Sequence, residues 1–165
     1  MKTPATRNAA LLAIAGCCAI LVATLGSAPA LAADAVAPDP GAIVTAGDVQ
    51  KVLGGKWKAR VPEPGVLFYE EDGTGYRTVQ VYLRPANGRD VESLKSELVQ
   101  QGEPVEDVPG VGESAIYRPQ RQEATTEKTD KSGELYSLTI AVREATAADT
   151  KKFAVELAKR GAERI

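Results

Sequence analysis

The sequence contains no histidine in 165 residues, and its two cysteines, Cys17 and Cys18, are adjacent and close to the N-terminus. Without histidine, serine and cysteine nucleophiles lack their usual general base. Most zinc sites also depend on histidine and cysteine ligands. These absences exclude Ser/His and Cys/His catalysis and most zinc sites. We therefore expect a protein that is not an enzyme and that uses no cofactor.

Carboxylates are the remaining candidates for chemistry, and three of them are adjacent at Glu70, Glu71 and Asp72. A glycosidase pair or a calcium site would need such side chains to converge on one point. Neighbouring residues of a strand point to opposite faces, and no calcium-loop spacing follows these three. We interpret them as a solvated acidic turn, with calcium binding as the better of the two alternatives.

The first 32 residues have the layout of a secretion signal. Lys2 and Arg7 supply a positively charged start, and residues 9–25 form an apolar stretch. Ala30, Leu31 and Ala32 then give the small-residue pattern that precedes a cleavage site. We predict cleavage between Ala32 and Ala33, which removes both cysteines and leaves a periplasmic or secreted protein without disulfides.

Two other uses of the same segment stay open. The apolar stretch is at the lower limit of the length that spans a bilayer, so an uncleaved segment would act as an anchor. The run Ile14, Ala15, Gly16 and Cys17 also resembles a lipoprotein box in which Cys17 carries the lipid. Contact with a membrane is expected only in these two cases, and lipid at Cys17 would hold the protein at the cell envelope.

The exported chain is expected to have a negative net charge. Lys2 and Arg7 are among the 20 basic residues, and no acidic residue precedes Asp34, so 18 basic and 22 acidic side chains remain, a formal charge of −4. Phosphate neutralisation requires concentrated lysine and arginine. Bulk binding of nucleic acid is therefore not expected.

The periodicity of the remaining chain predicts one α+β domain over residues 42–165, preceded by a Pro-containing flexible tether at 33–41. Thr45 and Asp48 form a helix-capping pair. Hairpin-length connections favour an antiparallel sheet of four to six strands with helices packed on one face. The predicted elements are a helix after Thr45, strands at 56–61, 66–69 and 76–84, a helix at 90–101, strands at 115–117 and 134–143, and a helix from Thr146. Residues 121–129 are either strand or loop.

Gly110, Gly112 and Ala115 have the GxGxxA spacing of a dinucleotide-binding loop. That loop functions by ending a strand and opening a helix whose N-terminus meets the phosphates. Here Ile116 and Tyr117 favour a strand, and Pro119 would break a helix in its first turns. We interpret Gly110 as the residue after proline in a type II turn, where a positive φ is needed.

Two motifs carry a family resemblance. Residues 43–54 read IVTAGDVQKVLG and resemble the pattern ITxxDVxxVLG, and residues 109–115 read PGVGESA and resemble PGVGDxA. Together they resemble a family of small bacterial exported proteins and lipoproteins of unknown function. The resemblance implies export and a small α+β domain, and it supplies no catalytic residues.

The predicted strands gather basic and tyrosine side chains on the sheet face opposite the core. Arg and Tyr are favoured where proteins bind partners, although a solvated sheet face also fills with such polar residues. If this face binds, its partner would be an acidic protein or an anionic envelope polymer. The candidate residues are Lys56, Lys58, Arg60, Tyr76, Gln80, Tyr82 and Arg84.

The function favoured by these observations is an exported, non-enzymatic binding or accessory protein of the cell envelope. The alternative is an inhibitor of an extracellular hydrolase. Its inhibitory segment would be the loop at 103–112, which is acidic, contains proline and lies between periodic elements.

Overall fold

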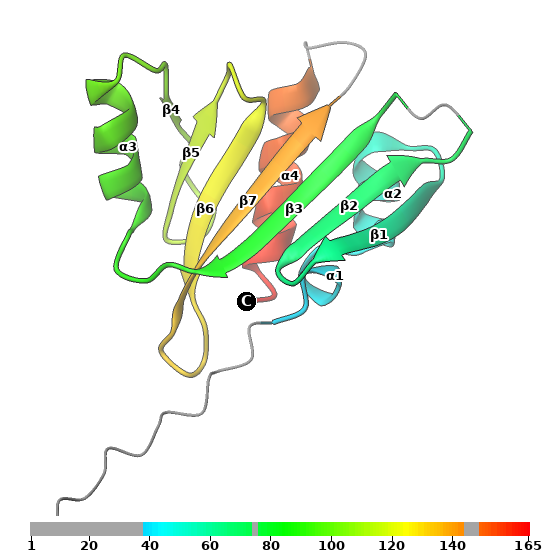
Figure 1. Ribbon diagram of the computed structural model, residues 1–165, viewed down its shortest axis with the longest axis horizontal. Coiled ribbons are helices and arrows are strands. Elements are labelled where there is room, and N and C mark those ends of the chain that lie inside the picture. Colours follow the sequence, from blue (N-terminus) through cyan, green and yellow to red (C-terminus); the bar gives the residue numbers. More distant parts are fainter. Residues whose placement is uncertain (1–37, 74–75, 144–148) are drawn as a thin grey trace, which may run out of the picture. The chain divides into compact units, whose positions relative to one another are not determined.

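The computed structural model describes residues 38–73, 76–143 and 149–165 (Figure 1). The helices in this part of the chain are α1 (Pro40–Ile43), α2 (Ala46–Leu53), α3 (Val91–Gln100) and α4 (Thr150–Ala162). The strands are β1 (Trp57–Glu63), β2 (Val66–Glu71), β3 (Thr78–Pro85), β4 (Glu106–Asp107), β5 (Ser114–Arg118), β6 (Glu123–Thr129) and β7 (Leu135–Arg143). The predicted leader, its cleavage site at Ala32 and Ala33, and Cys17 lie outside the described residues.

All strands belong to one antiparallel sheet in the order β1-β2-β3-β7-β6-β5-β4. The predicted α+β class is confirmed, with seven strands where four to six were expected. One addition is β4, a two-residue strand at the edge. The other is β6, the segment left open between strand and loop, which pairs with β5 on one side and β7 on the other.

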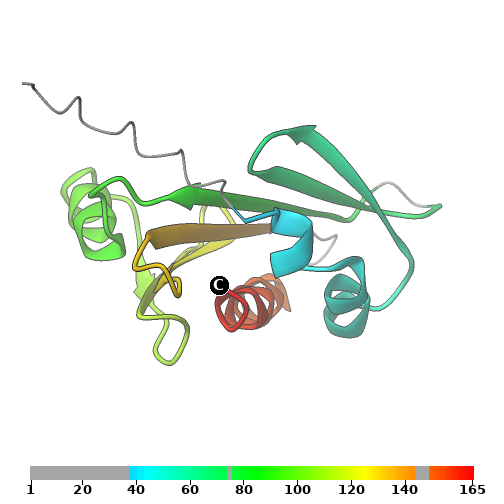
Figure 2. The same cartoon turned by 90° about the horizontal axis from the view of Figure 1, so that it is seen from below.

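The main core lies between one face of the sheet and the helices α1, α2 and α4 (Figure 2). Alternation places every second residue of β3 and β7 on this face, as predicted for Tyr136, Leu138, Ile140 and Val142. Ala154, Leu157 and Ala158 of α4 are fully buried against it. The sheet side chains of this core are Leu67, Tyr69, Val79, Val81, Leu83, Ala115, Tyr117, Ala124, Tyr136, Leu138, Ile140 and Val142.

The predicted capping pair begins α2. The backbone N–H of Asp48 donates to Thr45 Oγ1 at 3.2 Å, and the Asp48 carboxylate accepts from the Thr45 backbone N–H at 3.0 Å. The preceding helix α1 starts at Pro40, within the predicted tether, because Asp39 caps it and Pro40 suits a first helical position. Structured chain therefore begins before residue 42.

Helix α3 departs from the expectation that the helices share one face. Val91 and Leu98 of α3 pack on Ile116 of β5, and Ile116 faces away from the main core. The side chain of Glu127 on β6 also faces this way and accepts from the backbone N–H of Val91 at 2.7 Å. α3 therefore covers β5 and β6 on the second face of the sheet.

Strand β1 is more exposed than its alternating pattern indicated. Trp57 packs on the core and donates through Nε1 to the Gly54 carbonyl at 2.6 Å, but Ala59 is exposed and Val61 is 65% exposed. The prediction of a buried face on this strand was wrong beyond Trp57. β1 is an edge strand, and it is in contact with α2, the helix that precedes it in the sequence.

The last helix begins at Thr150 with Asp149 as its N-cap residue. The predicted start at Thr146 lies outside the described residues. Among the helices that are described, none is long and apolar enough to cross a membrane.

Candidate binding surface

The second face of the sheet is covered by α3 over β5 and β6, while β1, β2, β3 and β7 carry no described helix on this side (Figures 1 and 2). We call this uncovered part the open face. The strand register assigns its side chains. They are Lys58, Arg60, Val66, Phe68, Glu70, Thr78, Gln80, Tyr82, Arg84, Ser137, Thr139, Ala141 and Arg143.

The open face contains five of the seven predicted partner-binding residues: Lys58, Arg60, Gln80, Tyr82 and Arg84. The other two are outside it. Lys56 precedes β1, and Tyr76 precedes β3 with 83% of its surface exposed. The sequence pattern extended both strands too far toward their N-terminal ends.

Three of the four cations of the open face are paired with carboxylates of neighbouring strands and turns, and the fourth, Arg143, donates to the Arg121 carbonyl. Lys58 lies 2.6 Å from Asp72, Arg60 lies 3.5 Å from Glu70, and Arg84 lies 3.9 Å from Glu63. The hydrogen bond with Asp72 raises the pKa of Lys58, and the same bond lowers the pKa of Asp72. Carboxylates therefore offset the positive charge of Lys58, Arg60 and Arg84, the residues for which a basic surface was predicted.

Two half-buried aromatic rings of the open face lie beneath guanidinium groups. Arg60 lies 5.7 Å from the centre of the Phe68 ring, and Arg84 lies 5.9 Å from that of Tyr82. The Tyr82 hydroxyl donates to Gln80 Oε1 at 2.7 Å. Cation–π contact and this hydrogen bond favour one orientation of each group. Sequence reasoning missed Phe68 because the register across β1 and β2 was not known.

A hollow of about 400 Å³ lies where the open face meets the segment leading to α3 and α3 itself. Tyr82, Arg84, Ser137 and Thr139 line its sheet side, and Arg89 and Leu94 line the other. Glu123 is also in the lining. The hollow thus combines guanidinium, hydroxyl, aromatic and carboxylate groups, a set that can hydrogen-bond a polar partner.

Glu123 belongs to a three-residue charge network. Arg118 donates to Glu123 at 2.5 Å and to both oxygens of Glu103 at 2.9 and 3.1 Å. The side chains of all three are about 15% exposed. The hydrogen bonds from Arg118 lower the pKa of the Glu103 carboxyl. One guanidinium therefore holds two carboxylates beside the hollow.

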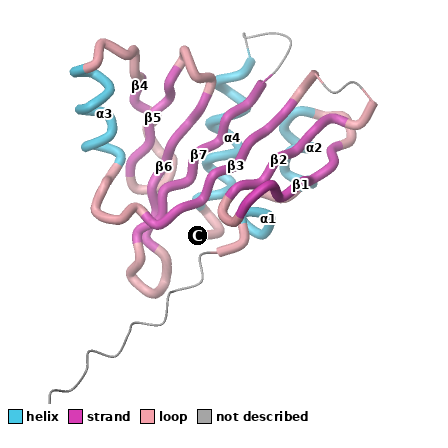
Figure 3. The backbone as a smooth tube through the Cα atoms, viewed as in Figure 1, coloured by secondary structure: helices cyan, strands magenta, loops and turns pink. Residues whose placement is uncertain are grey.

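The loop at 103–112, predicted as an inhibitory segment, is packed against the domain at several points. It contains β4 (Figure 3), and Val108 and Val111 are buried in the main core. Lys95 pairs with Asp107 at 2.5 Å, and Lys151 pairs with Glu106. These contacts hold residues 103–112 against the edge of the sheet.

The glycines of the GxGxxA spacing belong to a turn that leads into a strand. Gly110 has φ +78°, the positive value predicted for a turn after proline, and Gly112 has φ +58°. The next element is β5, which contains Ala115 and Ile116. A dinucleotide loop would open a helix at this point, so the interpretation of this stretch as a turn is confirmed.

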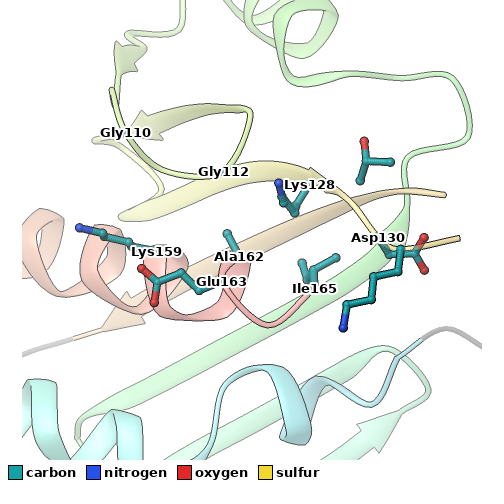
Figure 4. Close-up of a pocket in the computed structure, with 10 residues that line it drawn as sticks. Gly110, Gly112, Lys128, Asp130, Lys159, Ala162, Glu163 and Ile165 are labelled. Atoms are coloured by element: carbon teal, nitrogen blue, oxygen red, sulfur yellow. The ribbon is translucent and has the colours of Figure 1, made fainter. Parts of the chain in front are cut away.

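A hollow of about 520 Å³ lies beside these glycines and the end of α4 (Figure 4). Lys128, Lys131 and Lys159 contribute to its lining together with Asp130 and Glu163. Lys128 lies 3.5 Å from Glu113, and Asp130 Oδ1 accepts hydrogen bonds from its own turn at Ser132 and Glu134. The lining of this hollow therefore mixes positive and negative side chains, and it does not favour a ligand of either charge.

No group of three or more metal-ligating side chains occurs within residues 38–73, 76–143 and 149–165. The chain matches no protein-family model, and no curated protein matches it.

Proposed function

We propose that this is an exported, non-enzymatic binding or accessory protein of the cell envelope, and that its partner docks on the open face. One observation carries the proposal. Phe68 and Tyr82 lie under Arg60 and Arg84 on the part of this sheet face that no described helix covers. Interfaces are enriched in aromatic residues and arginine because these side chains combine large contact area with directed polar groups.

The ion pairs of the open face are compatible with docking of an acidic partner. The side chains of Arg60 and Glu70 are 66% and 50% exposed, and those of Arg84 and Glu63 are 65% and 63% exposed. Exposed pairs of this kind contribute little to stability. Carboxylates of an acidic protein or anionic envelope polymer can therefore replace Glu70 and Glu63 as partners of the arginines at little cost.

Capture experiments with a matched control test the proposal. The triple variant Arg60→Ala, Tyr82→Ala and Arg84→Ala removes the two guanidiniums and one ring, whereas Lys131→Ala with Lys159→Ala removes two cations from the other side of the molecule. We expect the wild-type protein and the lysine variant to recover the same partner from the cell-envelope fraction. The triple variant should recover at least tenfold less. Equal recovery by all three proteins would contradict the proposal.

Treating the envelope fraction with protease before capture separates the two kinds of partner. A partner that is a protein disappears after digestion, and an anionic polymer stays. Inhibition of a hydrolase through residues 103–112 is the weaker proposal, because Val108 and Val111 are buried and hold that segment against the core.

A further inference from the structure

A second surface lies on the opposite side of the sheet, between the antiparallel helices α2 and α4. At one end, Asp48 near the start of α2 pairs with Arg164, just beyond the end of α4. Toward the other end of α2, its last turn and the α4 residues from Lys152 to Arg160 enclose a groove of about 370 Å³. The volume is within the range of small-molecule sites.

The groove has an apolar floor and positively charged rims. Val52 of α2 and Phe153 and Val155 of α4 are half-buried, pack on the main core and line the groove. Lys51 and Lys152 stand on its two sides, one from each helix. Within the described residues, neither ammonium has a carboxylate within 4 Å, whereas Lys58, Arg60 and Arg84 of the open face are each paired with one.

The other two charged residues of the lining neutralise each other. Arg160 and Glu156 line the groove as an i,i+4 pair with a nitrogen–oxygen distance of 2.8 Å. The whole lining therefore has an excess of two positive charges in a chain with more acidic than basic residues. An occupant that complements this surface is apolar along its length and negatively charged at one end.

The dimensions of the groove argue against a helical peptide, and the lack of backbone hydrogen-bond partners argues against an extended one. The lining on α4 runs from Lys152 to Arg160, about 12 Å at 1.5 Å per residue. A helix of this length, about 10–12 Å across, fills a larger volume than the groove of about 370 Å³ offers. An extended peptide would fit, but its backbone N–H and C=O groups would face helices whose own backbone groups are already bonded.

From this geometry we infer that the groove between α2 and α4 binds a single-chain fatty-acyl carboxylate, with the alkyl chain on Val52, Phe153 and Val155 and the head group between Lys51 and Lys152. The inference is independent of the proposed function, because the groove and the open face lie on opposite faces of the sheet. It adds a lipid-binding site to the helical side of the molecule.

Titration calorimetry of the purified protein with dodecanoate, below its micelle-forming concentration, tests this site. We expect one saturable site. Octanoate, which is too short to cover the floor of about 12 Å, should bind about tenfold more weakly, since burying one methylene group strengthens binding by up to about fourfold. Dodecyl maltoside, with the same chain and an uncharged head, should also bind about tenfold more weakly. Equal binding of the two head groups, or no saturable binding up to millimolar dodecanoate, would overturn the inference.

Variants locate the binding within the groove. Lys51→Gln and Lys152→Gln should each weaken dodecanoate binding several-fold, and the matched change Lys131→Gln on another surface should leave it unchanged. Val52→Trp fills the floor and should abolish binding without altering charge. Circular dichroism establishes that each variant is folded, and Val155→Trp replaces Val52→Trp if the latter unfolds the protein. Unchanged binding in the folded filled-groove variant would contradict the site.

Discussion

The Arg164 guanidinium forms a two-pronged ion pair with the Asp48 carboxylate, with nitrogen–oxygen distances of 2.6 and 2.9 Å. The same guanidinium donates to the Ile43 carbonyl at 2.7 Å. Asp48 is 2% exposed and also belongs to the capping box of α2. One residue near the C-terminus therefore joins α1 and α2 to α4 across most of the domain sequence.

Replacing Arg164 by alanine should destabilise the protein by about 2–3 kcal/mol, because the buried Asp48 carboxylate loses its cationic partner. The loss is below that of a fully buried pair because the Arg164 side chain is 38% exposed. Urea unfolding followed by circular dichroism measures the change. Arg160→Ala, which removes only the exposed pair with Glu156, is the control and should cost less than about 0.5 kcal/mol.

The same pair predicts an acid-sensitive component of stability. The hydrogen bonds from Arg164 hold the pKa of Asp48 well below its usual range. A carboxyl whose pKa is lower in the folded state stabilises the fold above its unfolded pKa of about 3.9. This stabilisation is lost as the pH falls from that value through the folded pKa. Unfolding free energies should therefore drop more steeply below about pH 4 in the wild-type protein than in Asp48→Asn. Parallel curves for the two proteins would contradict this assignment.

The capping box illustrates which parts of the fold were predictable. Thr45 and Asp48 are three residues apart, so local spacing was sufficient to predict their contact. The alternation of β7 was equally local. β6 was not assigned because its sequence is polar, and its burial depends on partners distant in sequence. Thr126 Oγ1 donates to the Val111 and Ser114 carbonyls, and Thr125 bonds Thr139.

The candidate surface was predictable only in part for a related reason. Alternation placed Arg60, Tyr82 and Arg84 on one face, but it did not give the register between strands. Register decides that Glu70 and Glu63 come within 4 Å of the arginines, and that Phe68 joins the same face. The groove between α2 and α4 was not predictable, since it depends on the packing of helices that are about 100 residues apart in sequence.

Gly112 should be the least replaceable glycine of the 109–112 turn. It has φ +58°, and a Cβ at this position would overlap Thr126 Oγ1 and the Glu127 carbonyl oxygen of β6. Gly112→Ala therefore combines backbone strain with a clash against β6, which is fixed by its pairing with β5 and β7. We expect the free energy of unfolding to fall by at least about 3 kcal/mol. Gly110→Ala is the matched control. Its φ is also positive, but open space surrounds the added Cβ, so only the strain of about 1–2 kcal/mol applies. Equal losses in denaturant unfolding would show that the contact with β6 is unimportant.

Arg118 should stabilise the wall of the hollow beside the open face through its two carboxylate partners. Arg118→Met keeps much of the side-chain volume but leaves Glu103 and Glu123 close together without a cation, so the charges repel and lose their hydrogen bonds. We expect the midpoint of thermal unfolding at pH 7 to fall by roughly 5 °C. Adding Glu103→Gln and Glu123→Gln to this variant removes the repulsion and should recover most of the loss. If the triple variant were as unstable as Arg118→Met alone, the effect of Arg118 would come from packing of its alkyl stem instead of from the charge network.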